Sequence, residues 1–206
     1  MSAPIEFYFD FISPYGYLGA AQIEALAARH GRTVDWKPFL LGVTVLKVMG
    51  LKPLMETPLK ADYIRHDKPR LASLLGVPMT QPDMKGVTSV RAERAFLSLK
   101  QRDPELAKRF ARRVFERLWQ RGKDITAMEA VLEEATALGV DGAALRADIE
   151  SPAGKARLEA AVQEAVDRGV FGAPFFIADG EPFWGSDRLW MLEHWLTHGN
   201  WSPQPR

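Results

Sequence analysis

The first forty residues pass from an alternating pattern into a helical spacing and back. Apolar side chains recur at every second position over residues 5–11, which predicts a β-strand, and the aromatic content agrees. The pair Ser13-Pro14 predicts an N-cap and a first helical turn, and Gly31 predicts the end of that helix. Apolar positions over 34–39 predict a second strand. We therefore expect a strand–helix–strand unit with parallel strands.

The middle of the chain has a different pattern. From about 58 to 168, amphipathic segments are separated by proline and glycine, so helices are expected and strands are not. The last of these helices is predicted to begin at Ser151-Pro152 and to end at Arg168-Gly169.

A shorter strand unit follows the helical block. Residues 175–177 predict a strand, the Asp-Gly pair at 179–180 is typical of a hairpin turn, and 182–184 are expected to return beside it. A Ser-Asp pair at 186–187 is predicted to cap a last helix.

The order of elements predicts a single α/β domain over residues 1–206. A large all-helical insertion, about 58–168, is expected between a β-α-β half and a β-β-α half of one small sheet. A length of 206 residues with 47% hydrophobic side chains suits one sizeable core.

Composition narrows the classes of function. Lys plus Arg number 27 against 26 Asp plus Glu, so no overall charge favours nucleic acid or an anionic membrane. The chain has no cysteine, which excludes disulfides, a protein thiolate nucleophile and cysteine-ligated zinc. We expect a small-molecule partner, and any thiol chemistry needs a sulfur from outside the chain.

The sequence patterns typical of export, membrane insertion and metal binding do not occur in this chain. Residues 1–6 lack the basic and apolar regions of a secretory signal, so a cytoplasmic location is expected. No stretch approaches the roughly 20 apolar residues of a membrane span. His194 and His198 are four residues apart without a third ligand, so no metal site is expected.

A run of basic residues has two interpretations. The side chains recur at helical spacing opposite apolar positions, and they are Lys108, Arg109, Arg112, Arg113, Arg117 and Arg121. We favour the solvated face of an amphipathic helix over a patch that binds nucleic acid.

Three places can carry chemistry, and each also has an ordinary structural interpretation. Ser13 is an N-cap, and the helix N-terminus beside it also favours an anion such as a bound thiolate. Pro174 suits the first position of a strand, and a cis Ala173–Pro174 bond would turn the backbone outward to pair with an extended peptide. Ser186 and Asp187 are caps that also offer groups to an ammonium and carboxylate pair.

Three segments are more specific together than any one of them. Residues 7–15 read FYFDFISPY, residues 169–175 read GVFGAPF and residues 183–189 read FWGSDRL, in this order around the helical block. In these segments the chain resembles the 2-hydroxychromene-2-carboxylate isomerases and the related kappa-class glutathione transferases, which have a thioredoxin fold of the DsbA type. The resemblance covers nearly the whole chain and is strongest at its two ends.

The resemblance implies a glutathione site. Ser13 corresponds to the serine that hydrogen-bonds and activates the glutathione sulfur, which fits a chain without cysteine. Pro174 is implied to be cis, with the Ala173 backbone paired to the cysteinyl part, while Ser186 and Asp187 hold the γ-glutamyl end. The residues implied to bind glutathione are Lys60, near the glycyl carboxylate, and Ala173, Pro174, Trp184, Gly185, Ser186 and Asp187.

Two further residues are candidates for contact with a substrate. Lys47 is a candidate for a substrate anion, and Tyr15 for an aromatic wall, with core packing an equal alternative for Tyr15. Two positions depart from the family pattern. Relatives usually have a β-branched residue where this chain has Ala173, and many have an amide where it has Leu51, which removes a polar contact from the ligand cleft.

The activity implied by the resemblance is a glutathione-dependent isomerisation. It interconverts 2-hydroxychromene-2-carboxylate and trans-o-hydroxybenzylidenepyruvate in the breakdown of aromatic compounds. Two alternatives remain at this point: a kappa-type transferase that releases a glutathione conjugate, and a thioredoxin-like binding module without catalysis. The resemblance also implies a homodimer.

Overall fold

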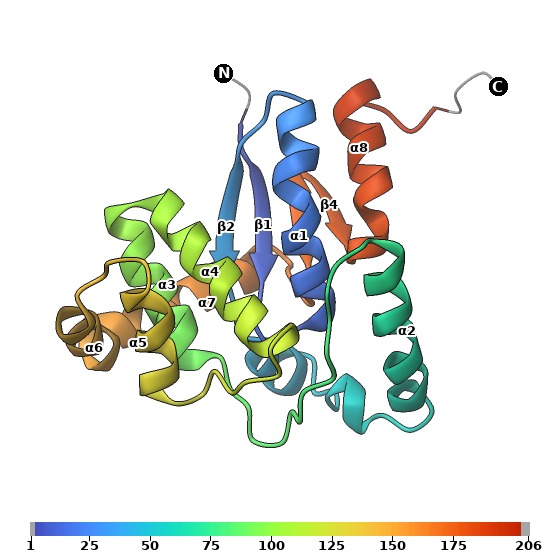
Figure 1. Ribbon diagram of the computed structural model, residues 1–206. Coiled ribbons are helices and arrows are strands. Elements are labelled where there is room, and N and C mark those ends of the chain that lie inside the picture. Colours follow the sequence, from blue (N-terminus) through green and yellow to red (C-terminus); the bar gives the residue numbers. More distant parts are fainter. Residues whose placement is uncertain (1–2, 203–206) are drawn as a thin grey trace.

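A four-stranded sheet forms the centre of the fold (Figure 1). The structure, a computed structural model, describes residues 3–202, so positions 1–2 and 203–206 of the predicted domain lie outside the described residues. The strands are β1 (Ile5–Phe9), β2 (Val34–Pro38), β3 (Phe175–Ala178) and β4 (Glu181–Trp184). They lie in the order β2-β1-β3-β4, with β1 parallel to β2 and antiparallel to β3, and with β3 antiparallel to β4.

Both predicted strand units are confirmed. In the first, helix α1 (Pro14–Arg29) connects β1 to β2 and begins directly after its N-cap, Ser13. In the second, residues 179–180 form the turn between β3 and β4. Strand β1 ends at Phe9, earlier than predicted, because the Asp10 carboxylate accepts the Ile12 N–H at 3.1 Å and turns the chain there.

The chain between β2 and β3 is helical, as predicted, and forms the insertion between the two halves of the sheet. Residues 39–174 are all described and contain no strand. The elements are a π-helix, η1 (Gly42–Val48), a short 3-10 helix, η2 (Leu54–Glu56), and the helices α2 (Lys60–Leu74), α3 (Val90–Arg102), α4 (Pro104–Trp119), α5 (Met128–Thr136), α6 (Gly142–Glu150) and α7 (Pro152–Asp167). The pattern of apolar and polar residues in the sequence had not predicted η1 or η2.

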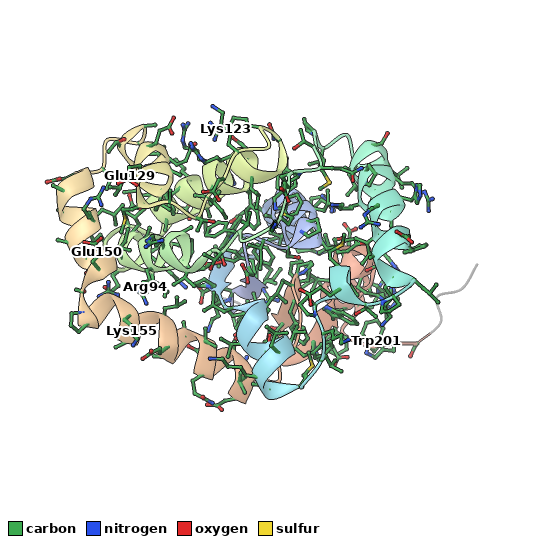
Figure 2. The ribbon with its side chains drawn as sticks, turned by 90° about the horizontal axis from the view of Figure 1, so that it is seen from below. Arg94, Lys123, Glu129, Glu150, Lys155 and Trp201 are labelled. Atoms are coloured by element: carbon green, nitrogen blue, oxygen red, sulfur yellow. The ribbon has the colours of Figure 1, made fainter. Side chains whose placement is uncertain are left out.

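The helices of the insertion lie in two groups, and α2 packs its Ala72 into the same core cluster as α1 and α4. Figure 1 shows α3 to α6 gathered on one side of the view and α2 on the other. Seen from below in Figure 2, the far end of the insertion, marked by Glu129, Glu150 and Lys155, lies opposite Trp201. Arg94, also labelled there, donates from α3 to the carbonyl of Ile149 at 3.2 Å and so ties α3 to α6. Within residues 3–202, no helix has the length and apolar character to span a membrane.

Helices cover both faces of the sheet. On one face, Phe7 and Phe176 stack with ring centroids 5.2 Å apart and pack into the main core with α1. On the other face, Tyr8 and Phe175 form a second apolar cluster with Ala165 of α7. Tyr8 is therefore buried, although it stands at a polar position of the alternating pattern. Strand β1 is therefore buried on both faces of the sheet.

Helix α4 carries most of the basic residues that were predicted to form a solvated face, and this prediction is wrong for Lys108. Lys108 is buried, and its ammonium lies 3.1 Å from Glu24 and 2.9 Å from Glu105. The Arg112 guanidinium also approaches Glu24, at 3.8 Å, and lies over the ring of Trp36.

The other arginines of this run surround one carboxylate. Glu134 of α5 is 1% exposed, and its oxygens lie 3.0 Å from Arg113, 3.0 Å from Arg117 and 2.7 Å from Arg121. Arg109 is exposed and has no ion pair among the described residues. The basic run therefore serves mainly to hold α4 against α1 and α5.

The last helix, α8 (Leu189–His198), begins later than predicted. Residues Ser186–Arg188 form a separate 3-10 turn, η3, and Arg188 is the N-cap residue of α8, without a capping side chain. The prediction that Ser186 and Asp187 cap this helix is wrong, because the extra turn moves both side chains away from the first N–H groups of α8. Asp187 instead pairs with Arg188 at 2.5 Å.

Candidate functional site

Three segments that are distant in the sequence meet at the carboxyl end of β1. They are the turn at 10–13, the loop at 172–174 and the turn at 185–187. The register places them together, because Tyr8 pairs with Phe175 and Phe175 pairs with Trp184 across three neighbouring strands. The meeting point lies at the N-terminus of α1, where the helix dipole favours negative charge.

Ser13 is the residue of this site that the sequence predicts most directly. Its Oγ accepts the Gly16 N–H at 2.9 Å, which makes it the N-cap of α1, and donates to the Ala173 carbonyl oxygen at 2.9 Å. A serine hydroxyl has one hydrogen to donate. The side chain is thus a cap and a link to the loop before β3 at the same time, and it is only 4% exposed.

The Ala173–Pro174 peptide bond is cis, as the resemblance implied. Helix α1 can approach the proline because residue 19 is glycine: a methyl group there would lie 3.0 Å from Cβ of Pro174 and 3.2 Å from the ring of Phe176. Ala173 is half-buried, and its N–H makes no hydrogen bond with any described residue. An unpaired N–H beside an accepting carbonyl can pair with an extended peptide backbone.

The turn at 185–187 is fixed to the proline. Gly185 donates its N–H to the Pro174 carbonyl at 3.0 Å, and its φ of 107° lies in the region that favours glycine. Ser186 is buried, and its hydroxyl has no hydrogen-bond partner among the described residues. The Asp187 carboxylate is exposed and has Arg188 as its ion-pair partner. The turn therefore presents a hydroxyl and a carboxylate beside the proline.

Tyr15 follows Ser13 on the first turn of α1 and faces α2. Its hydroxyl donates to the Asp67 carboxylate at 2.7 Å. Burial raises the pKa of Tyr15 above its usual range, and the hydrogen bond to Asp67 and the negative charges of Asp67 and Asp187 raise it further. Tyr15 is thus a neutral hydroxyl between α2 and the turn that carries Asp187.

The remaining predicted residues are not joined to this cluster by polar contacts. Lys47 lies on η1 and Lys60 is the first residue of α2; both are exposed, and neither has an ion pair among the described residues. Trp184 is exposed, and its indole packs edge-on against Phe171, with ring centroids 4.8 Å apart. The structure thus brings together Ser13, Ala173 and Pro174 with the turn at 185–187.

Two buried acids lie under the site, and sequence reasoning missed both. The Asp10 carboxylate accepts hydrogen bonds from Ser89 Oγ at 2.6 Å and from the Leu41 N–H at 2.9 Å, in addition to the Ile12 N–H, and its carbonyl accepts the Ser13 N–H at 3.0 Å. Burial raises its pKa, and these hydrogen bonds oppose that shift. Asp10 therefore connects the Ser13 turn to the start of η1 and to α3.

The second acid is Glu93 of α3. Its Oε1 accepts the Phe11 N–H at 3.2 Å, while Oε2 is enclosed and has no hydrogen-bond partner in the described part of the chain. Burial raises the pKa of Glu93 well above its usual value, and the nearby charge of Asp10 raises it further. The signal that could have identified it is a charge on the stripe of Ala92, Phe96 and Leu99, which faces the core.

Comparison with known proteins identifies the family. Residues 4–197 match the DSBA-like thioredoxin domain. A 2-hydroxychromene-2-carboxylate isomerase of Sphingobium xenophagum is 32% identical over 197 residues, which cover 95% of this chain and 99% of the relative. Glutathione S-transferase kappa 1 of Caenorhabditis elegans is 30% identical over 215 residues, covering 98% of this chain and 92% of the relative.

Solved structures agree with the sequence comparison. The structure of a 2-hydroxychromene-2-carboxylate isomerase superposes with a TM-score of 0.84 at 28% identity and covers 94% of both chains. A probable DsbA oxidoreductase from Streptomyces coelicolor shares the fold, with a TM-score of 0.75 at 20% identity over 98% of this chain and 93% of that one. The chain therefore belongs to the DSBA-like thioredoxin domain family, and its relatives there include 2-hydroxychromene-2-carboxylate isomerases and kappa glutathione transferases.

Proposed function

We propose that this protein is a glutathione-dependent isomerase that interconverts 2-hydroxychromene-2-carboxylate and trans-o-hydroxybenzylidenepyruvate. The observation that carries the proposal is the hydroxyl of Ser13 at the N-terminus of α1, facing a cis Ala173–Pro174 bond in a chain without cysteine. Such a site favours a sulfur anion and cannot supply the sulfur itself. The relatives named as isomerases support the reaction.

The residues present fit glutathione. The unpaired Ala173 N–H suits the backbone of its cysteinyl residue, and the exposed carboxylate of Asp187 suits the ammonium of its γ-glutamyl end. Ser186 adds a hydroxyl at the same end, where Gly185 and Trp184 form the adjoining wall. Lys60 has no ion pair within residues 3–202 and is proposed to meet the glycyl carboxylate.

Glutathione supplies a sulfur nucleophile whose reversible addition to the conjugated double bond of the opened substrate lets that bond rotate. The chain contributes the stabilisation of negative charge. Ser13 Oγ keeps its bond from the Gly16 N–H and turns its hydrogen from the Ala173 carbonyl toward the sulfur, because one hydroxyl cannot donate to both. The dipole of α1 acts in the same direction and lowers the pKa of a nearby thiol.

The substrate is proposed to lie between α1 and the segment that carries η1. Tyr15 provides an aromatic wall with a neutral hydroxyl that Asp67 holds in place. Lys47, on η1, is proposed to meet an anionic group of the substrate. Leu51 lies just after η1 with an exposed side chain, and it is proposed to offer the substrate an apolar surface.

Calorimetric titration combined with an isomerisation assay tests the proposal. Glutathione is expected to bind with a saturable signal at millimolar concentrations or below, and the chromene carboxylate is expected to convert to its open isomer while total glutathione stays constant. No glutathione binding, or conversion at the same rate without glutathione, would contradict the proposal.

A transferase is the second candidate, since kappa glutathione transferases are also relatives at about 30% identity. The same assay separates the two, because a transferase consumes glutathione in proportion to the electrophile that it converts. Stoichiometric loss of glutathione, with a stable conjugate by mass spectrometry, would replace the isomerase by a transferase.

We also infer that the protein works as a homodimer in the cytoplasm. Support for association comes from the apolar side chains of residues 46–59, which are exposed in one chain; Leu59 alone is 88% exposed. Light scattering of the purified protein is expected to give about twice the 23.1 kDa mass of one chain. A concentration-independent monomer mass would contradict the dimer.

A further inference from the structure

Lys68 is a lysine on the inner face of α2 and has no anionic partner within residues 3–202. It lies on the buried stripe of this helix, four residues from Ile64 and four from Ala72, and is 5% exposed. No hydrogen bond or ion pair to its ammonium occurs among the described residues. The other strongly buried lysine, Lys108, pairs with two carboxylates. Burying an ammonium without such a partner costs stability.

The contacts around Lys68 place it beside the Ser13 turn. Its Nζ lies 5.5 Å from the centre of the Trp119 ring, and the Trp119 indole N–H donates to the Phe11 carbonyl at 2.8 Å. The preceding residue of α2, Asp67, accepts the Tyr15 hydroxyl. Phe11 and Tyr15 stand two positions before and two positions after Ser13. Both neighbours of Lys68 are thus anchored to the loop that carries the proposed sulfur site.

The ammonium itself is not sealed in. The enclosed side-chain nitrogen and oxygen atoms without a hydrogen-bond partner include Glu93 Oε2 and Arg94 Nε, and Lys68 Nζ is not among them. Most of the Lys68 side chain is therefore covered, while its charged nitrogen is not fully enclosed. Burial lowers the pKa of Lys68, and the positive charge of Arg65 lowers it further, so the surroundings of the amine provide no compensating anion.

We propose that Lys68 binds the carboxylate of the aromatic substrate beside the Ser13 turn. The inference rests on the proposed function for the substrate class, and it assigns the role of anion ligand to Lys68 in addition to the exposed Lys47. An ammonium fixed against Trp119 has free N–H donors and little rotational freedom to lose, so a carboxylate gains a charge-assisted hydrogen bond at small entropic cost.

The test uses a planar aromatic carboxylate and its neutral analogue. Calorimetry measures the binding of trans-cinnamate and of cinnamamide to the full chain, with and without saturating S-methylglutathione, whose blocked sulfur cannot react. Wild type is expected to bind cinnamate more tightly than cinnamamide. Lys68→Met keeps the buried stem and removes the charge, and it is expected to weaken cinnamate binding about tenfold while leaving cinnamamide unchanged.

Three further variants separate the charge of Lys68 from overall charge and from the other candidate lysine. Lys68→Arg is expected to retain cinnamate binding within about threefold of wild type, because the charge remains. Lys123→Met, at the exposed lysine labelled in Figure 2, controls for the overall charge and is expected to bind like wild type. Lys47→Met measures the other candidate. A loss of cinnamate affinity in Lys47→Met together with unchanged affinity in Lys68→Met would overturn the proposal.

Separate measurements test whether the Lys68 variant folds and whether the proposed function holds. Lys68→Met is expected to melt at the same temperature as wild type or higher, because an uncompensated charge has been removed. If Lys68→Met melts higher and binds cinnamate as wild type does, Lys68 is only a buried residue and the proposal is wrong. Absence of saturable cinnamate binding to wild type at millimolar concentration also overturns it. Glutathione titration of the same samples tests the proposed function independently.

Discussion

The Ser13 hydroxyl donates to the Ala173 carbonyl oxygen at 2.9 Å, across 160 positions of the sequence. This bond joins the start of α1 to the residue before the cis proline. It also uses the one hydrogen that Ser13 has to offer. A ligand atom that takes this hydrogen must compete with the Ala173 carbonyl, so binding at the site is coupled to a change in how its two halves are held together.

Replacing Ser13 by alanine separates its two roles. We expect Ser13→Ala to lower the free energy of unfolding by about 1 kcal/mol, as for other caps, and to lower glutathione-dependent turnover about 100-fold or more. Thermal unfolding and steady-state kinetics measure the two effects.

The chain offers a matched control for this variant. Ser151 begins α7 in the same Ser-Pro-x-Gly pattern, accepts the Gly154 N–H at 2.9 Å and donates to the Asp148 carbonyl at 2.7 Å. Ser151→Ala is expected to lose similar stability and to keep its turnover. Equal kinetic losses in both variants would reduce Ser13 to an ordinary cap and favour a binding module.

The carboxylate of Asp187 is expected to act in binding rather than in turnover. Asp187→Asn should raise the Kd for glutathione about tenfold by removing the charge opposite the ammonium of the γ-glutamyl end, with kcat at saturation little changed. Calorimetry gives Kd, and kinetics at saturating glutathione give kcat. Asp179→Asn, which removes the exposed carboxylate paired with Arg32, is the control and should leave Kd unchanged. An unaltered Kd in Asp187→Asn would remove this residue from the site.

The buried Glu93 predicts a pH dependence of stability. An acid whose pKa is raised by folding holds its proton more tightly in the folded chain. Its contribution is therefore complete below its ordinary pKa of 4.5 and is lost as the pH rises through the raised value. Relative to Glu93→Gln, the wild-type free energy of unfolding should fall as the pH rises from 4.5 toward neutral. Denaturant titrations at a series of pH values measure this difference, and parallel curves would contradict it.

Glu134 is expected to matter more for stability than its neighbour Glu133. Glu134→Gln leaves three arginines around a neutral amide in a buried place and should cost about 3 kcal/mol. Glu133→Gln removes a carboxylate that is 64% exposed and bound to Arg117 alone, so it should cost less than about 1 kcal/mol. Denaturant unfolding compares the two variants. Similar losses of unfolding free energy in the two variants would show that solvent screens both carboxylates.

Local chemistry explains which parts of the fold could be predicted from the sequence. Ser13-Pro14 and Ser151-Pro152 each mark a helix start, because a cap and a proline at the first helical position act within one turn. The Asp-Gly pair at 179–180 fixes the hairpin in the same local way. The cis bond before Pro174 and its pairing with Ser13 came from the resemblance, since no local pattern requires them.

The residues whose surroundings the sequence did not reveal depend on distant partners. Tyr8 is buried because α7, more than a hundred residues later, covers the second face of the sheet. Lys108 is buried because it forms an ion pair with Glu24 of α1. The spacing of apolar residues along α4 does not reveal this distant partner. Ser186 failed as a cap because an added 3-10 turn delays the start of α8. Lys68 and Glu93 stand on apolar stripes, and a charge at such a position is the signal to look for.

The division of the site between the two ends of the chain also sets an order of assembly. Ser13 leaves the ribosome before the helical insertion, and Ala173 and Gly185 leave it only after that insertion. A nascent chain that stops before β3 has a helix N-terminus without the loop that faces it. Ligand can therefore stabilise the finished protein by mass action and cannot rescue its truncated products.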